Sequence, residues 1–468
     1  MKTYKPTIGI EVHAELKTHT KMFCNSKNDP HASEPNVHVC PICMGHPGTL
    51  PVINKTAVEH VLKVGIALGS ELATYTEFDR KNYFYPDIPK GYQISQYEFP
   101  LVKGGELNGI AITRVHLEED TARSLHDQGD GSIIDYNRAG VPLMELVTEP
   151  VIHDAKTAGD FARELQLLLR TLGVSDANME KGEMRVEANI SVSDSDTFGT
   201  KVEVKNLNSF KSVEGAIAYE IKRQIEVIES GEKVIQETRG WDESKGKTFS
   251  QRVKESANDY RYFPDPDLPK LNLEISNEIS LSRLNEQMPE LPSQKRSKYK
   301  NIGLTIEQIE IIIGTSPIDN FISKLVLLLD NDSAKLKLAA NYILSDLLPL
   351  LGNKTIMEVN AKSFASLIYL LSEDKITSRV AKDILPEIIF STIDPVTLIE
   401  ERGLVQNNSE EAITLLVMEV LKNNPEVVFE YKNGKDSAIQ YLVGQCMKVS
   451  KGSANPKTLI EVLKKSIT

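Results

Sequence analysis

Regular alternation of apolar and polar residues predicts several β-strands in the first part of the chain. From residue 8 to residue 16, apolar side chains stand at every second position, and Glu11, His13 and Glu15 stand between them. The same alternation recurs over 184–192 and 201–205. Because successive side chains of a strand point to opposite faces, each segment would bury one face and expose the other. Strands with one solvated face are typical of antiparallel sheets.

Helical spacing of apolar residues predicts the remaining elements. Helices are expected near 57–68 and 157–172, the second with a leucine-rich stripe that ends at Gly173. Prolines then punctuate residues 264–292, and the chain beyond them is rich in leucine and isoleucine. Further helices are expected around 306–313, 334–351, 361–371, 380–389, 410–422, 437–449 and 456–465.

These patterns predict an α+β chain of three domains, which agrees with a usual domain size of about 150 residues. The β-rich part is expected over 1–292, an all-helical part over 293–396 and a small helical tail over 397–468.

The composition is that of a globular protein, with 26% charged and 40% hydrophobic residues. The longest apolar runs are far shorter than a membrane span, and Glu11 interrupts the apolar stretch near the N-terminus. We therefore expect neither a membrane segment nor a signal peptide. The four cysteines do not form a disulfide framework, which suits a reducing cytoplasm.

Charge is unevenly distributed along the chain. The net charge of −12 argues against a DNA-binding protein. The segment 432–468 nevertheless holds seven lysines against Asp436 and Glu461. Such a local excess of positive charge suits the phosphate backbone of RNA, and a solvated helical tail is the alternative.

Acidic residues recur on the polar faces of the expected strands. Besides Glu11, His13 and Glu15, the segment 116–120 (HLEED) is dense in metal-ligating types, and Glu145 and Glu149 share one face of another strand. A solvated sheet face is the simplest interpretation of one strand alone. Several such strands together favour a Mg²⁺ site, because Mg²⁺ prefers carboxylate oxygens and usually accompanies a nucleotide phosphate. The chain has no phosphate-binding glycine loop.

Cations lie close to these acids. The segment 79–87 combines Arg80 and Lys81 with three aromatic residues, and polar strand positions carry Arg185, Lys201 and Lys205 alongside Glu187 and Glu203. Cross-strand salt bridges would explain this second group. The other interpretation is that the cations neutralise charge during phosphoryl transfer.

Three cysteines form a possible metal site. Cys40 and Cys43 form a C-x-x-C pair, Cys24 lies 16 residues upstream, and His31, His38 and His46 are near in sequence. A structural zinc site and three packed thiols without metal both fit this pattern.

Several longer segments carry a resemblance to a known family. They are 8–16 (IGIEVHAEL), 78–87 (FDRKNYFYPD), 92–96 (YQISQ), 116–120 (HLEED), 205–209 (KNLNS), 259–264 (DYRYFP), 441–445 (YLVGQ) and 451–456 (KGSANP). On these segments the chain resembles, essentially end to end, the B subunits of bacterial aspartyl/glutamyl-tRNA amidotransferases.

The resemblance implies a cradle similar to the glutamine synthetase and guanidino kinase fold, then a helical domain and a YqeY-like tail. The cradle would bind ATP, Mg²⁺ and the 3′ end of a misacylated tRNA, and would phosphorylate the side-chain carboxylate of the misattached glutamate or aspartate. An amidase (A) subunit would supply ammonia from glutamine through a channel, a small C subunit would complete a heterotrimer, and the tail would contact the tRNA.

The resemblance also implies roles for individual residues. The magnesium ligands would be Glu11, His13, Glu119 and Glu145. Strand alternation, however, groups Glu118 with His116 and Glu119 with Val115 and Leu117, so Glu118 is retained as a neighbour. The residues expected to line the catalytic cleft are Lys81, Tyr83, Glu118, Lys205, Asn206 and Asn208, and those expected to bind the nucleotide are Arg80, Arg185 and Lys201. Many members carry four zinc thiolates; here Ser26 replaces one, which leaves Cys24, Cys40 and Cys43.

Two other functions are weighed against this one. A standalone ATP-dependent amide ligase would explain the cradle but not the lysine-rich tail. A non-enzymatic tRNA-binding assembly factor would show no ATP turnover. The chain has no amidase signature, so a partner would have to hydrolyse glutamine.

Overall fold

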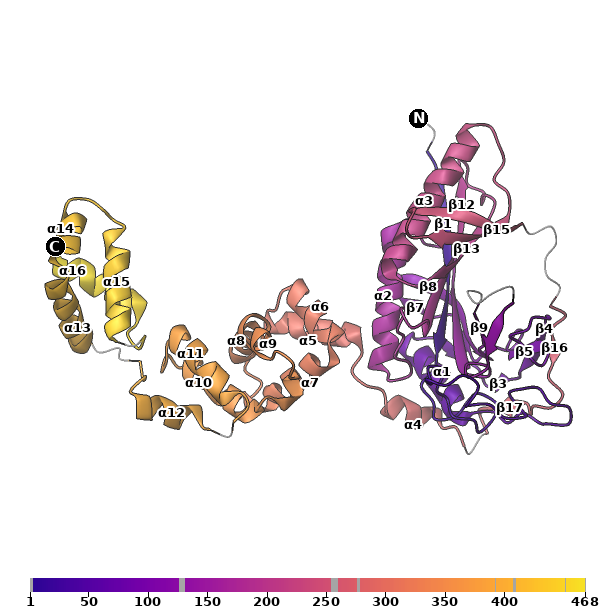
Figure 1. Ribbon diagram of the computed structural model, residues 1–468, viewed down its shortest axis with the longest axis horizontal. Coiled ribbons are helices and arrows are strands. Elements are labelled where there is room, and N and C mark those ends of the chain that lie inside the picture. Colours follow the sequence, from indigo (N-terminus) through magenta and orange to yellow (C-terminus); the bar gives the residue numbers. More distant parts are fainter. Residues whose placement is uncertain are drawn as a thin grey trace. The chain divides into compact units, whose positions relative to one another are not determined.

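The computed structural model describes residues 3–125, 131–253, 260–275, 278–391, 393–406, 410–450 and 452–467, which form two compact units (Figure 1). The first unit comprises residues 1–292 and the second residues 293–468. Asp259 and Lys451, which belong to two of the motifs above, lie outside the described residues.

The first unit is built on a ten-stranded sheet that contains all the predicted strands. Its order is β15 (Lys247–Val253), β14 (Glu237–Asp242), β13 (Val202–Leu207), β12 (Met184–Ser193), β1 (Lys5–Glu15), β11 (Pro142–Thr148), β8 (Ile110–Glu119), β6 (Val102–Lys103) and β2 (Glu71–Leu72), with β7 (Glu106–Leu107) paired to β8. The pairs are antiparallel except β13 with β14. The prediction of one apolar and one polar face is confirmed at β1, where Ile8, Ile10 and Val12 are fully buried.

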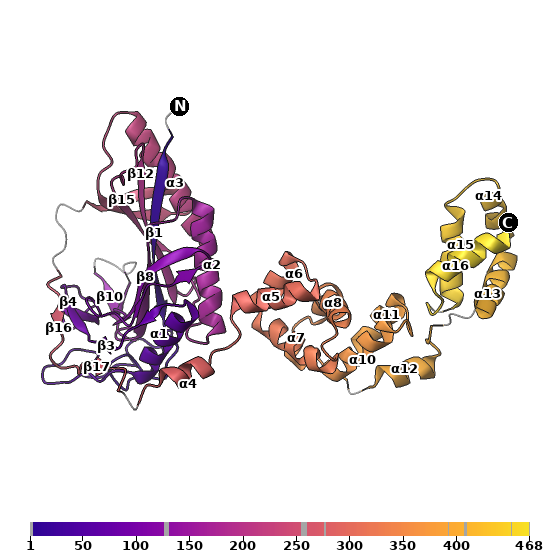
Figure 2. The same cartoon turned by 180° about the vertical axis from the view of Figure 1, so that it is seen from behind.

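Helices cover the apolar face of this sheet. They are α1 (Lys55–Ala67), α2 (Ala155–Thr171) and α3 (Phe210–Glu229). Figures 1 and 2 show α2 and α3 along one side of the sheet. The side chain of Asp154 accepts a hydrogen bond from the Thr157 amide (2.8 Å) and starts α2. Phe161 and Leu165 of α2 are buried in the core, so burial of this stripe holds the helix against the sheet.

Smaller elements lie beside the main sheet. Strands β16 (Phe263–Pro264), β4 (Asp79–Asn82) and β5 (Tyr92–Ser95) form a three-stranded sheet, and β5 packs against β8. Two further pairs are β9 (Arg123–Leu125) with β10 (Ile133–Asp135) and β3 (Tyr75–Thr76) with β17 (Leu271–Asn272). A short helix α4 (Leu281–Glu286) contacts α1.

The second unit is helical in the residues that the structure describes. Its helices are α5 (Pro292–Ile302), α6 (Ile306–Gly314), α7 (Ser316–Leu328), α8 (Ser333–Tyr342), α9 (Leu348–Leu350), α10 (Ala361–Ser372), α11 (Ser378–Ile388), α12 (Pro395–Arg402), α13 (Glu410–Asn423), α14 (Pro425–Lys432), α15 (Ala438–Val449) and α16 (Pro456–Ile467). The mixed α/β composition and the helical C-terminal region are thus confirmed.

One predicted helix is interrupted. The segment 334–351 was expected to be continuous, but a π-helical turn, Ile343–Leu347, separates α8 from α9. Pro349 lacks an amide hydrogen and cannot donate the α-helical hydrogen bond to the residue four positions before it. This accounts for the π-helical turn that precedes it.

The last four helices share an apolar cluster of their own, centred on Val417, Leu442, Leu459 and Leu463. A domain boundary at 396/397 stays a prediction.

Within the described residues no single helix is both long and apolar enough to cross a membrane; α6 and α7 meet those criteria only as a pair, with a bend of 107° between them.

Candidate functional site

The polar face of the central strands aligns acidic and imidazole side chains in rows. Strand register places Arg185 of β12 opposite His13 of β1, His13 opposite Glu145 of β11, and Glu145 opposite His116 of β8. The next row places Glu11 opposite Glu187 of β12. Four neighbouring strands therefore direct their polar groups to one patch.

The first row forms a tight cluster. His13 Nε2 lies 3.3 Å from Glu145 Oε2 and 3.8 Å from Glu118 Oε1, and His116 Nε2 lies 3.5 Å from Glu145 Oε2. Ligand atoms of His13, Glu118 and Glu145 all lie within 4.8 Å of one another. Ser95 Oγ of β5 donates a hydrogen bond to Glu118 Oε2 (3.1 Å), which fixes that carboxylate.

The electrostatics of this cluster favour added positive charge. Burial alone would lower the pKa of His13, but the hydrogen bond and charge of Glu145, together with Glu118, raise that pKa to about 9. Burial lowers the pKa of His116 to about 4 despite Glu145. Burial also raises the pKa of Glu118. The two carboxylates thus hold a proton on His13, and a divalent cation would provide the same compensation.

A second acidic cluster adjoins the first. Oxygens of Glu11, Glu187 and Glu203 lie within 4.8 Å of one another. Lys205 Nζ lies 2.8 Å from Glu187 Oε2 and 3.4 Å from Glu203 Oε1. Burial would lower the pKa of Lys205, but Glu187 and Glu203 raise it above its ordinary value. Burial, with Glu145 and Glu187, raises the pKa of Glu11.

A β-bulge brings Lys205 and its neighbour to this site. Between the pairs Val186↔Leu207 and Ala188↔Val204, β12 contributes one residue, Glu187, whereas β13 contributes Lys205 and Asn206. Asn206 adopts a left-handed conformation (φ 59°), which is uncommon for a residue other than glycine. The bulge lets two consecutive side chains reach the same cavity, which regular alternation would prevent.

Residues of both clusters, though not Glu203, border one cavity of about 400 Å³. Its walls are Glu11, His13, Lys81, Tyr83, Gln93, Glu118, Asp120, Thr121, Arg138, Leu143, Glu145, Arg185, Glu187, Lys205 and Asn206. Burial would lower the pKa of Lys81, but Glu118 and Tyr262 raise it, so its ammonium is retained. The carboxylates of Glu118 and Glu145 suit Mg²⁺, and the adjacent cations suit an anionic substrate.

One wall of the cavity contains residues that the sequence analysis did not name as site residues. Asp120 accepts a hydrogen bond from Arg185 (3.0 Å) and lies 3.7 Å from the Arg138 guanidinium. Asp120 closes the HLEED motif and Gln93 lies in the YQISQ motif, so both could have been found there, whereas Arg138 lies in none of the motifs. Strand alternation predicts Glu187 and Glu203 only as salt-bridge partners.

Glu119 is not part of the cluster in which the resemblance placed it. Its side chain points to the opposite face of β8, where it pairs with Lys90 and accepts a hydrogen bond from the Ile94 amide (3.0 Å). The physical reason is strand alternation, which puts Glu118 on the face of His116. Glu118 is therefore the residue that lies with His13 and Glu145.

Three other predicted site residues also lie away from the cavity. Arg80 faces away from Lys81 on β4 and binds Asp265 (2.9 Å) and Asp267 (2.8 Å). Lys201, just before β13, and Asn208, just before α3, are exposed and do not line the cavity. The structure thus brings Glu11, His13, Lys81, Tyr83, Glu118, Glu145, Arg185, Lys205 and Asn206 together, but not these three or Glu119.

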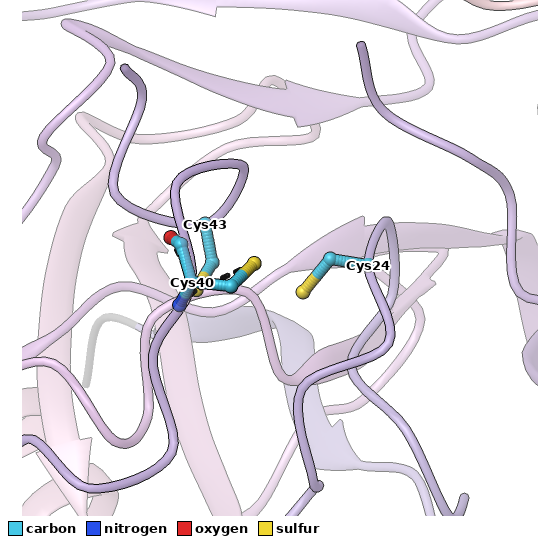
Figure 3. A group of neighbouring side chains, drawn as sticks. All are labelled: Cys24, Cys40 and Cys43. Carbon is cyan, nitrogen blue, oxygen red and sulfur yellow. Dashed lines mark hydrogen bonds between the residues drawn. The ribbon is translucent and has the colours of Figure 1, made fainter. Parts of the chain in front are cut away.

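The cysteines lie at a separate place. Figure 3 shows the Cys24 side chain directed toward the loop that carries Cys40 and Cys43, and the three sulfurs lie within 4.8 Å of one another. Ser26 Oγ is 3.9 Å from Cys43 Sγ. The ammonium of Lys21, a fully buried residue, is 3.9 Å from the same sulfur and donates to the Tyr136 carbonyl (3.1 Å). Sequence inspection missed Lys21.

Comparisons with known proteins agree with the predicted resemblance. Residues 6–279 match the family described as the GatB/GatE catalytic domain, and residues 327–467 match the family described as the GatB domain. Similar proteins occur in Caldicellulosiruptor saccharolyticus (44% identical, 99% of both chains covered), Thermodesulfovibrio yellowstonii (44%, 98% of both) and Thermus thermophilus (43%, 98% of both). All three are named as the B subunit of aspartyl/glutamyl-tRNA(Asn/Gln) amidotransferase.

Proposed function

Since the chain belongs to the family of aspartyl/glutamyl-tRNA(Asn/Gln) amidotransferase B subunits, we propose that its acidic cavity uses ATP to activate the side-chain carboxylate of a misacylated tRNA. The observation that supports this most directly is the single cavity shared by two acid clusters and by Lys81, Arg185 and Lys205.

Activation is needed because a carboxylate is a poor electrophile. One carboxylate oxygen would attack the γ-phosphorus of ATP, so that ADP leaves and an acyl phosphate forms. Ammonia would then attack the acyl carbon, phosphate would leave, and the nitrogen would lose a proton to give the amide. The products would be glutaminyl-tRNA or asparaginyl-tRNA, depending on the amino acid attached.

The residues of the cavity suit this reaction. Bringing ATP next to a carboxylate opposes like charges, and Lys81, Arg185 and Lys205 would offset that repulsion. Mg²⁺ held by the cluster of His13, Glu118 and Glu145, or by the adjoining cluster that contains Glu11, would neutralise the nucleotide phosphates. Ser95 would keep Glu118 oriented through its hydrogen bond.

A second pocket supports a route for ammonia. A cavity of about 100 Å³ between the cysteines and β5 is bordered by Lys90 and Glu119. A narrow space of about 10 Å³ adjoins it at these two residues and shares Gln93, Asp120 and Thr121 with the large cavity. We propose that ammonia passes the Lys90–Glu119 pair on its way to the large cavity. The pair would keep ammonia out of that cavity until the carboxylate has been phosphorylated.

The remaining parts of the proposal concern partners. The chain shows no amidase signature, so an amidase (A) subunit would release ammonia from glutamine, with a small C subunit completing a heterotrimer. The helical tail, α13 to α16, would contact the body of the tRNA through its lysines. A cytoplasmic location fits the free cysteines of the described residues.

Glutamyl-tRNA is expected to trigger ATP cleavage. The complex of the chain with both partners should form ADP and glutaminyl-tRNA in equal amounts, because each amide requires one activated carboxylate. The measurement is parallel assay of ADP and of the amino acid released from the tRNA, with uncharged tRNA as the control. Absence of ADP formation with both glutamyl-tRNA and aspartyl-tRNA would refute the proposal.

We also propose that Cys24, Cys40 and Cys43 bind a structural zinc ion. Three thiolates with Zn²⁺ carry a net charge of −1, which the buried Lys21 ammonium would balance. Metal analysis of the purified chain is therefore expected to find about one zinc per chain, and Cys43→Ala should remove it. Equal zinc content in both proteins, or none in the unmodified chain, would contradict the assignment.

A further inference from the structure

Five tyrosine rings form a continuous strip, and one of them borders the acidic cavity. The strip consists of Tyr85, Tyr83, Tyr260, Tyr262 and Tyr97. Successive ring centroids are 6.1 Å, 6.0 Å, 6.1 Å and 4.4 Å apart, and the last pair is stacked nearly parallel. Tyr83 lines the cavity, and the Lys81 ammonium lies 5.2 Å from the centre of the Tyr260 ring.

Two side chains of β4 hold the segments that carry Tyr260 and Tyr97. The amide hydrogens of the Asn82 side chain are donated to the carbonyls of Tyr260 (3.2 Å) and Arg261 (2.8 Å), and Asp79 accepts from the Tyr97 amide (2.9 Å). Arg261 has a positive φ of 45°, a conformation that costs energy for a residue other than glycine. The two hydrogen bonds from Asn82 stabilise this bend between Tyr260 and Tyr262.

Both ends of the strip are exposed. Tyr97 is 65% and Tyr85 59% accessible to solvent, and the neighbouring Phe84 is 88% accessible. An exposed apolar surface that adjoins a cavity is a candidate binding surface. The strip therefore joins the reaction cavity to an exposed aromatic surface.

We propose that the tyrosine strip binds the unpaired 3′-terminal nucleotides of the aminoacyl-tRNA by stacking against their bases. This inference rests on the proposed function. The reacting carboxylate must lie in the cavity, and only the short amino-acid side chain separates it from the ester on the terminal ribose. The last bases must then lie at the cavity rim. Aromatic rings bind single-stranded bases by stacking, with little preference for sequence.

Tyr97→Ala is expected to weaken tRNA binding by the complex about 5- to 150-fold, the range for loss of one base–aromatic stack. Binding is measured with uncharged tRNA, intact and trimmed of its unpaired 3′ nucleotides. The variant should lose affinity for the intact tRNA only, and its KM for ATP should not change. Tyr97→Phe keeps the ring and should bind normally.

Phe198, a 74% exposed aromatic residue in the β12–β13 turn, is the matched control, and Phe198→Ala should leave binding unchanged. An equal effect of Tyr97→Ala on intact and trimmed tRNA, or no effect, would overturn the proposal. A raised KM for ATP with unchanged tRNA binding would assign the strip to adenine instead. Because binding needs no catalysis, failure of the complex to form amide would refute the proposed function without deciding the role of the strip.

Discussion

Replacing Glu145 with glutamine is expected to lower the rate of ATP-dependent amide formation by about 10²- to 10³-fold. The Glu145 carboxylate is the common neighbour of His13 (3.3 Å), His116 (3.5 Å) and Arg114 (3.6 Å). Burial alone would raise its pKa, but His116 and His13 hold that pKa well below its usual range, so the group is an anion. Glutamine has nearly the same shape but removes the charge that would bind Mg²⁺.

The measurement is the initial rate of amide formation as the Mg²⁺ concentration is varied, with ammonium salt as the nitrogen source so that the partner amidase does not limit it. Glu149→Gln is the matched control. Glu149 follows β11 but accepts its hydrogen bond from Thr113 (2.7 Å) outside the cavity. Its replacement should leave the rate unchanged. A Glu145→Gln protein that keeps its fold and its rate at low Mg²⁺ would remove the acid cluster from the mechanism.

The two-residue period of the sequence accounts for how much of the site could be predicted. It places Glu11 and His13 on one face of β1, and the polar residues of β11 and β12 lie beside them once these strands pair. The sheet and its covering helices follow from the same reasoning. Pairing order and register do not, because they depend on contacts between segments far apart in sequence.

Other features depend on local departures from regular structure. The bulge that directs both Lys205 and Asn206 into the cavity has no periodic signal, and neither does the loop that brings Arg138 to Asp120. Arg80 and Lys81 are adjacent in a motif, yet only Lys81 reaches the cavity, since alternation separates them. A motif locates a site in the chain, whereas strand geometry decides which of its residues enter that site.

The adjacent residues Glu118 and Glu119 should therefore behave differently when each is replaced by glutamine. Glu118→Gln is expected to lower glutamyl-tRNA-dependent ADP formation by about 10²- to 10³-fold, because that carboxylate lies in the cluster with His13 and Glu145. Glu119→Gln should still form ADP but yield less amide, because its partner Lys90 lies on the proposed ammonia route. Water would then hydrolyse the acyl phosphate. Assay of ADP and amide in one reaction measures both effects.

A second substitution, at Lys90, distinguishes a loss of stability in Glu119→Gln from a loss of ammonia delivery. Glu119→Gln leaves a largely buried ammonium without its counter-ion, which typically destabilises a protein by about 3–5 kcal/mol. Adding Lys90→Met should restore the melting temperature, yet ADP should still exceed amide, because the charged pair stays absent. If the double variant instead formed as much amide as ADP, the defect of Glu119→Gln would be one of stability. If Glu119→Gln lost ADP formation as completely as Glu118→Gln, the two faces of β8 would not divide activation from ammonia delivery.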